Sequence, residues 1–449
     1  MTLPASLLHE LKNPSLSVDQ RAELCCEAAK AFEYQGEFEK ARKVLGDYWQ
    51  RIGEYPKLKG LERNTAGELL LRAGVLTGAI GSKVQIAESQ EIAKNLITES
   101  LRIFQSSQYR KKIAEAQTEL ALCYWRTGEL NNARDLLTDA LSLLTTPNEV
   151  KAKAIVRLAI VEAQAGSDNK ALRILTENES LFERLNNETL KGSYHVTLGT
   201  VQSHLWESKQ RSDYLDRALI EYAAAGYHFD RAGHKCYLAN VENQLGLIYF
   251  KVNRCDEAHQ HLDRARRIHV SLRDAGTVAQ VDETRAMVFL KQGRNKEAEK
   301  AARAAVYGQE KTGSDLLLVE ALITHGRALA RLERYSAALF AFRRAFDLSE
   351  QTENTNRAGA AALAAFHEIG EHLAVVESGN VLPGRGLNSE KLSLERDVLK
   401  RALEQAEGSV THAARSLKIS FQALTYMLNT RHRDLLKYRT PVRRRKPRR

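Results

Sequence analysis

The chain has 449 residues, of which 43% are hydrophobic and 27% charged, with only seven prolines and a formal net charge of +11. This length fits two or three ordinary domains, or one long repeat array with an appendage. Few prolines, abundant Ala and Leu, and few β-branched clusters between turn signals leave little room for a sheet. The composition therefore predicts an all-α protein and favours the repeat array.

The five cysteines do not form the pattern of a metal site. Their number is odd, their spacing is not that of paired metal ligands, and they lie inside apolar helical stripes, at Cys25, Cys26, Cys123, Cys236 and Cys255. They are typical of reduced thiols in a helical core.

The sequence has no feature of export or membrane insertion. The first residues, MTLPASLLHELKNPSL, lack the long apolar region of a signal peptide, and no run of eighteen apolar residues occurs. We therefore expect a cytoplasmic protein with no membrane partner.

The positive charge is concentrated at one end of the chain. Residues 380–449 contain seventeen Lys and Arg against six Asp and Glu, whereas residues 1–379 contain fifty of each kind. Affinity for nucleic acid rises with each phosphate that a protein neutralises. A neutral body with a basic end is what such binding requires, although a basic tail that only aids solubility would have the same composition.

A helical pattern recurs along the first 378 residues. Its first occurrence comprises Phe32, Gly36, Phe38, Ala41 and Leu45. Similar patterns recur at Leu120, Ala121, Tyr124, Gly128, Leu130, Ala133, Leu137 and Ala140, and again at Leu245, Gly246, Tyr249, Ala258, Leu262 and Ala265. A small residue recurs at the helix crossing, at Ala121, Ala159, Gly199, Gly246, Ala286 and Gly326, and the last two steps are forty residues each. The units resemble tetratricopeptide repeats, whose usual period is about 34 residues, so we expect longer helices or loops.

About eight such units are expected in residues 1–378. Two look irregular: residues 65–105 carry GAIGSKVQ between their helices, and residues 192–225 carry HLWESKQRSDYL. An alanine-rich helix over 357–378 is expected to cap the array.

The tetratricopeptide resemblance implies a right-handed superhelix whose concave side is lined by the first helix of each pair. Such grooves bind peptides or other proteins. The repeat register places Thr118, Asn240, Asn243, Gln280, Glu283 and Arg327 in that partner-binding groove, although any one of them also fits the pattern of an ordinary solvated residue.

Residues 379–391, GNVLPGRGLNSEK, contain three glycines and a proline without an apolar period. They are predicted to form a linker.

The stretch 392–428 predicts three helices, of which the second is short. The first carries an apolar stripe that ends at Gly408, and Ser409 follows as a cap for the second helix, 410–417. Small residues at Ala413 and Ala414 allow close helix crossing. Ser420 is a suitable N-cap for a third helix, in which Leu424 and Leu428 face the core.

This stretch resembles the Fis-type helix-turn-helix found at the C-termini of NtrC-type bacterial regulators. The matching residues are Leu394, Glu395, Arg396, Ala402, Leu403, Gly408, Thr411, Ala413, Ala414, Arg415, Leu417, Ile419, Ser420 and Leu424. The family usually has glycine where Lys418 stands, and arginine or lysine where Phe421, Gln422, Tyr426 and Met427 stand.

The resemblance implies binding to double-stranded DNA by the domain 392–432, with the third helix in a major groove. The predicted contacts are Thr411, Arg415, Ser420, Phe421, Gln422, Thr425, Tyr426, Asn429, Arg431, Arg433 and Lys437. Fis-type domains pair through the helix that precedes the helix-turn-helix, so a homodimer through Leu394, Val398 and Leu403 is expected, and with it a palindromic site.

Residues 433–449 form a basic tail ending in PVRRRKPRR. Dense like charge and two prolines predict disorder in isolation, and contact with phosphates or a minor groove.

No catalytic, cofactor or metal site is predicted. The segment GRGLNS lacks the Lys-Ser/Thr of a phosphate-binding loop and the strand that should precede it. Histidines such as His195, His204, His259 and His261 show neither an HExxH motif nor a cysteine partner.

Two functions remain open on the sequence. The first is a bacterial DNA-binding transcription regulator, nucleoid-associated when bound, whose repeats bind a protein or peptide. The second is a non-enzymatic solenoid adaptor whose basic end docks on an acidic protein or RNA. An NtrC-type ATPase module is lacking, which argues against promoter opening by that route.

Overall fold

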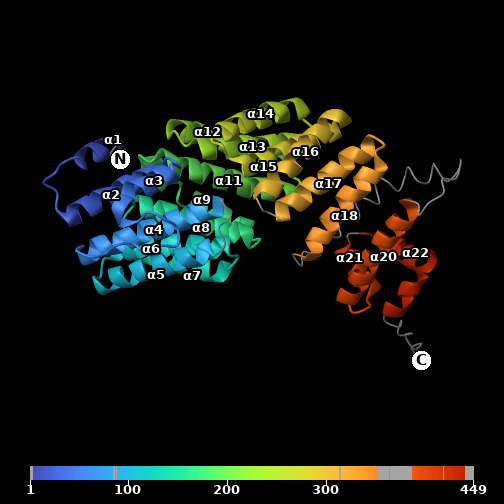
Figure 1. Ribbon diagram of the computed structural model, residues 1–449, viewed down its shortest axis with the longest axis horizontal. Coiled ribbons are helices and arrows are strands. Elements are labelled where there is room, and N and C mark those ends of the chain that lie inside the picture. Colours follow the sequence, from blue (N-terminus) through green and yellow to red (C-terminus); the bar gives the residue numbers. More distant parts are fainter. Residues whose placement is uncertain are drawn as a thin grey trace. The chain divides into compact units, whose positions relative to one another are not determined.

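The computed structural model describes residues 4–83, 86, 88–312, 315–351, 364, 387–417 and 419–439. In these ranges every regular element is a helix, which confirms the all-α prediction (Figure 1). The chain forms two compact units, Met1–Ile248 and Tyr249–Arg449. No helix among the described residues is both long and apolar enough to cross a membrane.

The first unit is built from antiparallel helix pairs (Figure 1). Its helices are α1 (Pro4–Glu10), α2 (Val18–Tyr34), α3 (Phe38–Leu45), α4 (Arg63–Lys83), α5 (Ser89–Ser106), α6 (Arg110–Arg126), α7 (Leu130–Leu143), α8 (Glu149–Gln164), α9 (Asp168–Thr176), α10 (Glu179–Arg184), α11 (Glu188–Lys209), α12 (Ser212–Arg231) and α13 (Lys235–Lys251), with the 3-10 turn η1 (Gly46–Tyr48) after α3. Within a pair the two helices pack along each other, as in α4 with α5 and α11 with α12.

Contacts between pairs follow a regular order. Helix α2 contacts α4, α4 contacts α6, α6 contacts α8, and α8 contacts α11. The first helices of successive pairs therefore line one common face, as expected for stacked helical repeats.

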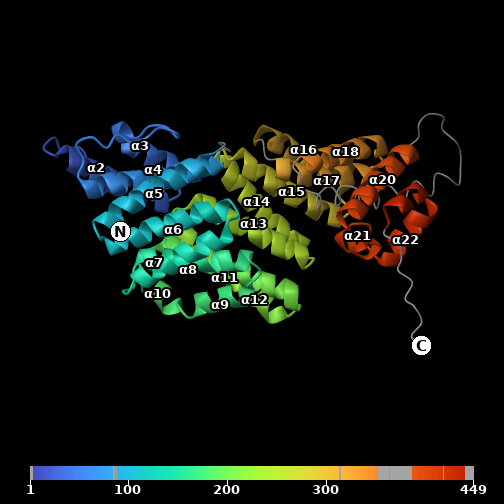
Figure 2. The same cartoon turned by 90° about the horizontal axis from the view of Figure 1, so that it is seen from below.

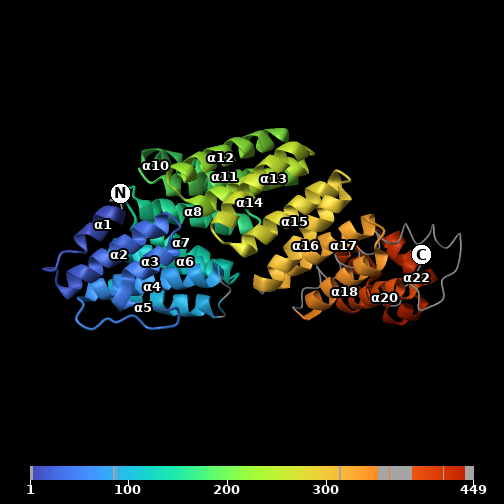
Figure 3. The same ribbon diagram turned by 45° about the horizontal axis from the view of Figure 1, so that its top comes forward.

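In its described residues, the second unit continues the pairs and then ends in a group of three helices and a 3-10 helix. Its helices are α14 (Cys255–Ser271), α15 (Ala275–Lys291), α16 (Asn295–Thr312), α17 (Asp315–Arg331), α18 (Tyr335–Gln351), α20 (Leu387–Gln405), α21 (Val410–Ser416) and α22 (Phe421–Thr430), followed by the 3-10 helix η2 (Arg433–Tyr438). Figure 3 shows α15, α16, α17 and α18 stacked side by side, in agreement with their contacts.

The repeat period matches the prediction of units longer than standard. Helices α13, α15 and α17 begin at 235, 275 and 315, forty residues apart, and each has seventeen residues. Short turns join the helices, and the residue that closes the preceding helix has a left-handed backbone, with φ of 65° at Asn253 and 71° at Gly293. In sequence order the described residues contain the eight helix pairs that the sequence predicts.

The predicted small residues do lie where helices cross. Ala121, Ala159 and Ala286 are buried, and so are the glycines of the same set. A Cβ atom added to Gly326 would lie 2.6 Å from Cε1 of Phe342, closer than atoms can approach. This close packing explains why bulky residues are absent at those positions.

Two segments that looked irregular are largely helical. Helix α4 continues to Lys83, so GAIGSK is its last part rather than a connection. In HLWESKQRSDYL only Gln210 and Arg211 lie between α11 and α12. Glycine persists in α4 because a Cβ atom on Gly81 would lie 2.2 Å from Cβ of Ser89. The predicted closing helix 357–378 lies outside the described residues, apart from Ala364.

The five cysteines are thiols that form no disulfide, as predicted. Cys25, Cys26 and Cys123 are buried, and the other two are half-buried. Burial raises the pKa of Cys25 to about 11 and that of Cys123 to about 11. Thiols in such surroundings stay protonated and unreactive.

Candidate functional site

Helices α20, α21 and α22 lie next to one another (Figure 2) and share one small hydrophobic core. Leu399 and Leu403 of α20, Ala413 of α21, and Leu424 and Leu428 of α22 are all buried in it. The predicted inward residues of the third helix are thus confirmed, and burial of this side fixes which side of α22 faces solvent.

The predicted caps also form. Helix α20 ends before Gly408, whose φ of 79° is the left-handed conformation that favours glycine. The Oγ atom of Ser409 accepts from the backbone N–H of His412 at 3.4 Å, and that of Ser420 accepts from Ala423 at 3.1 Å. Two hydroxyl caps therefore set the starts of α21 and α22.

The folded region extends beyond both ends of the predicted 392–432 domain. Helix α20 begins at Leu387, so the last five residues of the predicted linker 379–391 are helical. At the other end, η2 covers 433–438, and its Leu435 is fully buried in the same core. The basic tail was placed from residue 433, which is too early, because an apolar pair inside the charged stretch supplies this last piece of core.

The solvent side of α22 carries a mixed polar and aromatic surface. Phe421 and Tyr426 are 45% and 61% exposed, and Gln422 and Asn429 are exposed as well. A side-chain amide can make two hydrogen bonds to an adenine edge. The face can therefore make both hydrogen bonds and stacking or apolar contacts to bases.

Two predicted contact residues of the turn and helix are placed differently from expectation. Thr425 is half-buried, and its Oγ1 atom is shielded from solvent without a hydrogen-bond partner among the described residues, so it does not point outward. It stands one residue after the inward Leu424, which turns it toward the core side. Ser420 is exposed, but its Oγ atom is engaged in capping α22.

The predicted cations around α22 differ in how far they are already paired. Arg415 on α21 is exposed, as is Thr411 on the same helix. The Nη1 atom of Arg431 lies 3.5 Å from Oε2 of Glu395, so part of its charge is offset within the domain. Its contribution to phosphate binding should be reduced accordingly.

The remaining cations lie beyond α22. Arg433 is exposed, and its Nε atom donates to the carbonyl of Asn429 at 2.8 Å, which holds it beside the C-terminal end of α22. Lys437 is exposed, with its Nζ atom 5.1 Å from the centre of the Tyr438 ring. The arginine-rich end from Arg443 lies outside the described residues.

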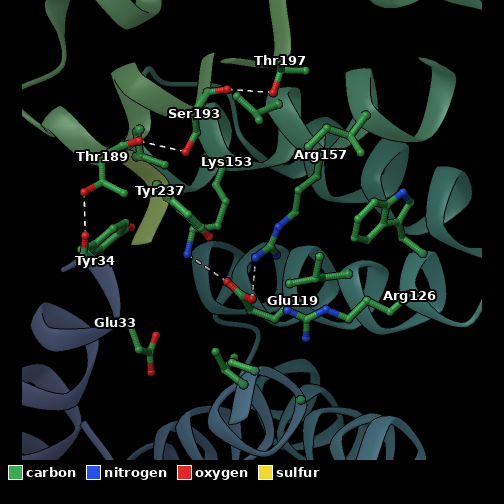
Figure 4. A pocket seen from close by; sticks show the side chains of 18 of the residues that line it. Glu33, Tyr34, Glu119, Arg126, Lys153, Arg157, Thr189, Ser193, Thr197 and Tyr237 are labelled. Carbon is green, nitrogen blue, oxygen red and sulfur yellow. Dashed lines mark hydrogen bonds and ion pairs between the residues drawn. The ribbon is translucent and has the colours of Figure 1, made fainter. Parts of the chain in front are cut away.

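A second candidate site is a cavity of about 400 Å³ inside the first unit (Figure 4). Most of its wall comes from the first helices of the pairs, α2, α4, α6, α8, α11 and α13. The apolar part of the wall includes Val75, Leu122, Val156, Ile160, Leu190 and Val196. A pocket of this size and character is typical of sites for small molecules.

Several polar groups on the cavity wall are already paired. Glu119 is bound by Arg157 at 2.8 Å and Lys153 at 3.0 Å, as the dashed lines in Figure 4 show. Although burial opposes it, the charge of Arg157, followed by that of Lys153, holds the pKa of the Glu119 carboxyl well below its usual range. This carboxylate is therefore ionised and its charge is offset.

Hydroxyl groups on the wall are also occupied. The Oγ1 atom of Thr189 donates to the carbonyl of Tyr34 at 2.6 Å. Ser193 donates to the carbonyl of Thr189 at 2.9 Å, and Thr197 to that of Ser193 at 2.7 Å. The Thr189 bond joins α11 to the end of α2, so it also ties distant repeats of the first unit together.

A buried charge network lies behind the cavity. The Arg72 guanidinium is fully buried and contacts Glu33 at 2.7 Å, Glu115 at 2.9 Å and Glu68 at 3.2 Å. Lys112 also contacts Glu115, at 3.2 Å. Burial raises the pKa of the Glu33 carboxyl, whose Oε1 atom has no hydrogen-bond partner among the described residues. Buried charges persist only when paired in this way.

The predicted groove residues do not form one set. Thr118 is fully buried and its hydroxyl donates to the carbonyl of Ala114 at 2.7 Å, so its placement in the groove was wrong. Asn240 is exposed and lines the cavity, and Asn243, one turn later, is half-buried.

The other predicted groove residues belong to the second unit. Gln280 is exposed and Arg327 is half-buried. Glu283 is half-buried, its Oε1 atom accepts from the Thr324 hydroxyl at 2.7 Å, and burial raises the pKa of its carboxyl.

The main cavity residues were not predicted from the sequence. Arg126 and Tyr237 lie 111 positions apart on α6 and α13, and both are exposed within the wall. Each stands among ordinary surface positions of an amphipathic helix. Only the stacking of repeats brings them to one cavity, so no local signal could have identified them. Among the described residues no group of three His, Cys, Asp or Glu is placed to hold a metal ion.

Comparison with solved structures finds helical-repeat proteins. The apo form of the quorum sensor NprR from B. thuringiensis is 12% identical, with a TM-score of 0.51, over 77% of this chain and 91% of that one. The apo form of RapI is 11% identical, with a TM-score of 0.50, over 82% of this chain and 96% of that one. At these identities the likeness supports the fold alone. No curated protein gives a significant match.

Two family models match separate parts of the sequence. The tetratricopeptide repeat model matches residues 277–351, and the model described as bacterial regulatory protein, Fis family, matches residues 393–429. The second match covers α21 and α22 with most of α20. The chain thus carries a tetratricopeptide repeat array followed by a Fis-type helix-turn-helix at its C-terminal end.

Proposed function

We propose that this protein is a bacterial DNA-binding transcription regulator whose helical repeats bind a partner that controls it. The observation that carries the proposal is the exposed side of α22, where Gln422, Tyr426 and Asn429 project from a helix anchored by Leu424 and Leu428. A helix presented in this way by a Fis-type domain suits the major groove.

The division of labour on this surface follows from its chemistry. Gln422 and Asn429 provide amides that can distinguish base edges, whereas Arg415 and Arg433 provide charge for phosphates. The arginine-rich end adds charge that is independent of sequence. Sequence preference and overall affinity should therefore depend on different residues.

The repeat array is the expected partner-binding part. Stacked repeats bury their apolar stripes against neighbours and leave the shared face of their first helices free for a partner. In the first unit this face contains the cavity lined by α2, α4, α6, α8, α11 and α13.

We also propose a homodimer, and the buried leucines of α20 favour contacts other than those first expected. Leu403 is fully buried and Leu399 is nearly so, both within their own core, so neither is available to a second copy. Val398 is half-buried against that same core, and the side chain of Leu394 lies outside the described ones. Light scattering of the full chain with and without a palindromic duplex would test pairing.

The function is tested by selecting duplexes from a random pool with the full-length protein. We expect enrichment of a defined motif and a binding constant that falls steeply with salt. The variant with Gln422→Ala and Asn429→Ala should bind DNA without enriching that motif. Gln405→Ala on α20 is a matched control, because Gln405 is exposed but lies outside α22.

The adaptor alternative predicts the opposite binding result. An adaptor would bind duplexes of all sequences equally and no better than single-stranded RNA or an acidic polypeptide of similar charge. That outcome, with no motif enriched at any salt concentration, would replace the regulator proposal.

A further inference from the structure

The cavity of the first unit is lined by more basic than acidic side chains, and one of the basic ones makes no ion pair within the part of the chain that the structure describes. Two acidic and three basic residues line it: Glu33 and Glu119 against Arg126, Lys153 and Arg157. Glu119 is paired with Lys153 and Arg157, and Glu33 is paired with Arg72 behind the wall. Arg126 makes no ion pair with any described residue.

The position of Arg126 is maintained by the helix opposite. Its Nη1 atom lies 3.1 Å from where a Cβ atom of Gly78 would stand, so the guanidinium rests against the bare backbone of α4. The guanidinium is partly open to the cavity, but desolvation by the surrounding wall lowers its pKa, and the nearby charge of Arg157 acts in the same direction. An anion beside Arg126 would relieve both effects.

A second hydrogen-bond donor lines the same cavity. Tyr237 of α13 contributes its phenol to the wall that also contains Arg126 of α6. Its ring is stacked on His234 with centroids 3.8 Å apart and packs edge-on against Phe229 at 5.1 Å, so the ring is held in place. Its hydroxyl has no hydrogen-bond partner among the described residues. Asn240, one turn further along α13, is also exposed to the cavity.

The rest of the wall favours a ligand with few polar groups. The hydroxyls of Thr189, Ser193 and Thr197 donate to backbone carbonyls, and the Glu119 carboxylate is paired with Lys153 and Arg157. A peptide brings an N–H and a C=O at each residue, and each would need a partner here. The donors on the wall left without a partner among the described residues are Arg126, the Tyr237 hydroxyl, the Asn240 amide and the indole N–H of Trp125. Together they suit a ligand with one anionic group, and the apolar surface suits the remainder.

We propose that this cavity binds a small apolar carboxylic acid, with its carboxylate at Arg126 and Tyr237 and its hydrocarbon part against Val75, Leu122, Val156 and Ile160. A guanidinium and a phenol both donate, and a carboxylate accepts from both. The volume of about 400 Å³ suits a molecule of this size. Such an acid would be a small-molecule effector, and its binding does not depend on whether the C-terminal domain binds DNA.

The test is calorimetric titration of the full-length protein, without DNA, with 4-phenylbutyrate and with the matched alcohol 4-phenylbutan-1-ol. We expect the acid to bind at least about tenfold more tightly than the alcohol, the difference that one charge-assisted contact provides. Arg126→Gln should abolish this preference, Arg126→Lys should keep part of it, and Tyr237→Phe should weaken acid binding several-fold.

Arg110→Gln is the matched control, because Arg110 starts the same helix, is exposed and lies outside the cavity. It should bind the acid as the unchanged protein does, and circular dichroism should show that all variants keep their helices. Equal binding of acid and alcohol, or unchanged acid binding by Arg126→Gln, would overturn the proposal. So would tight binding of the peptide Ala-Leu-Phe-Leu together with no binding of the small acid, which would assign the cavity to peptides.

Discussion

The imidazole of His234 packs directly on Gly36, although the two residues are 198 positions apart. A Cβ atom on Gly36 would lie 2.4 Å from Cε1 of His234, and the backbone there has φ of +73°. Both residues belong to the first unit. The contact joins the turn after α2 to the start of α13, and together with the Thr189 bond to Tyr34 it ties early repeats of this unit to late ones.

Gly36→Ala should therefore destabilise the protein by about 2–4 kcal/mol, from left-handed backbone strain plus the clash with His234. Gly128→Ala is the control, because φ is +82° there but no atom lies within 4 Å of the added Cβ. That variant should lose only the backbone part, about 1–2 kcal/mol. Urea unfolding followed by circular dichroism measures both, and equal losses would show that the His234 contact contributes nothing.

His234 also predicts a pH dependence of stability. Its side chain is almost fully buried, and burial lowers its pKa from 6.5 to about 4. The unfolded chain therefore takes up a proton near pH 6.5, whereas the folded one does so only near pH 4. Stability from this residue is complete above pH 6.5 and is lost as pH falls toward 4, by roughly 3 kcal/mol in total.

Unfolding free energies at pH 7, 6, 5 and 4.5 measure this effect. His234→Gln should flatten the profile across that interval while lowering stability at pH 7. If the variant and the unchanged protein lose stability in parallel, carboxyl groups rather than His234 are responsible for the loss.

The local parts of the fold were predictable from the sequence because local chemistry decides them. The caps at Ser409 and Ser420, the stop at Gly408 and the buried Leu424 and Leu428 depend on residues three or four apart. The forty-residue period could also be predicted, since each repeat has a small residue where its two helices cross.

The parts that failed depend on distant residues or on fine rotation of a helix. No sequence pattern near Arg126 predicts that Tyr237 lines the same cavity, because repeat stacking alone brings α6 and α13 to one cavity. Thr118 and Thr425 were placed outward by register, yet a shift of one position, about 100° around a helix, is enough to bury Thr118 and the hydroxyl oxygen of Thr425. Leu435 was not predicted as a core residue because it stands in a stretch rich in charged residues.

The buried cation Arg72 should be essential for folding of the first unit. It is 0% exposed and contacts three carboxylates, so removing it leaves buried negative charge without compensation. Arg72→Met should cost about 3–5 kcal/mol. By comparison Arg211→Ala, which breaks an exposed pair with Asp213, should leave stability nearly unchanged. Thermal unfolding compares them, and similar midpoints would mean that the network is dispensable.

Gln422 should affect sequence preference rather than overall affinity. It is exposed on α22 and can make two hydrogen bonds to an adenine edge. Gln422→Ala should relax discrimination at one base position by about 1–3 kcal/mol while leaving non-specific binding nearly unchanged. A competition assay between the selected duplex and versions with single base changes measures this preference. Preference that stays intact at every position would show that Gln422 is not a reader.

Truncation before Arg443 should have the opposite effect. The removed segment carries six of the chain's basic residues and no acidic one. Such charge acts on phosphates of any sequence, so affinity should fall alike for selected and scrambled duplexes. The slope of log K against log salt should flatten by roughly one for each phosphate that the shortened chain no longer neutralises. If truncation instead abolishes the preference for the selected duplex, while Gln422→Ala changes nothing, α22 is not the reading helix and the basic end gains that role.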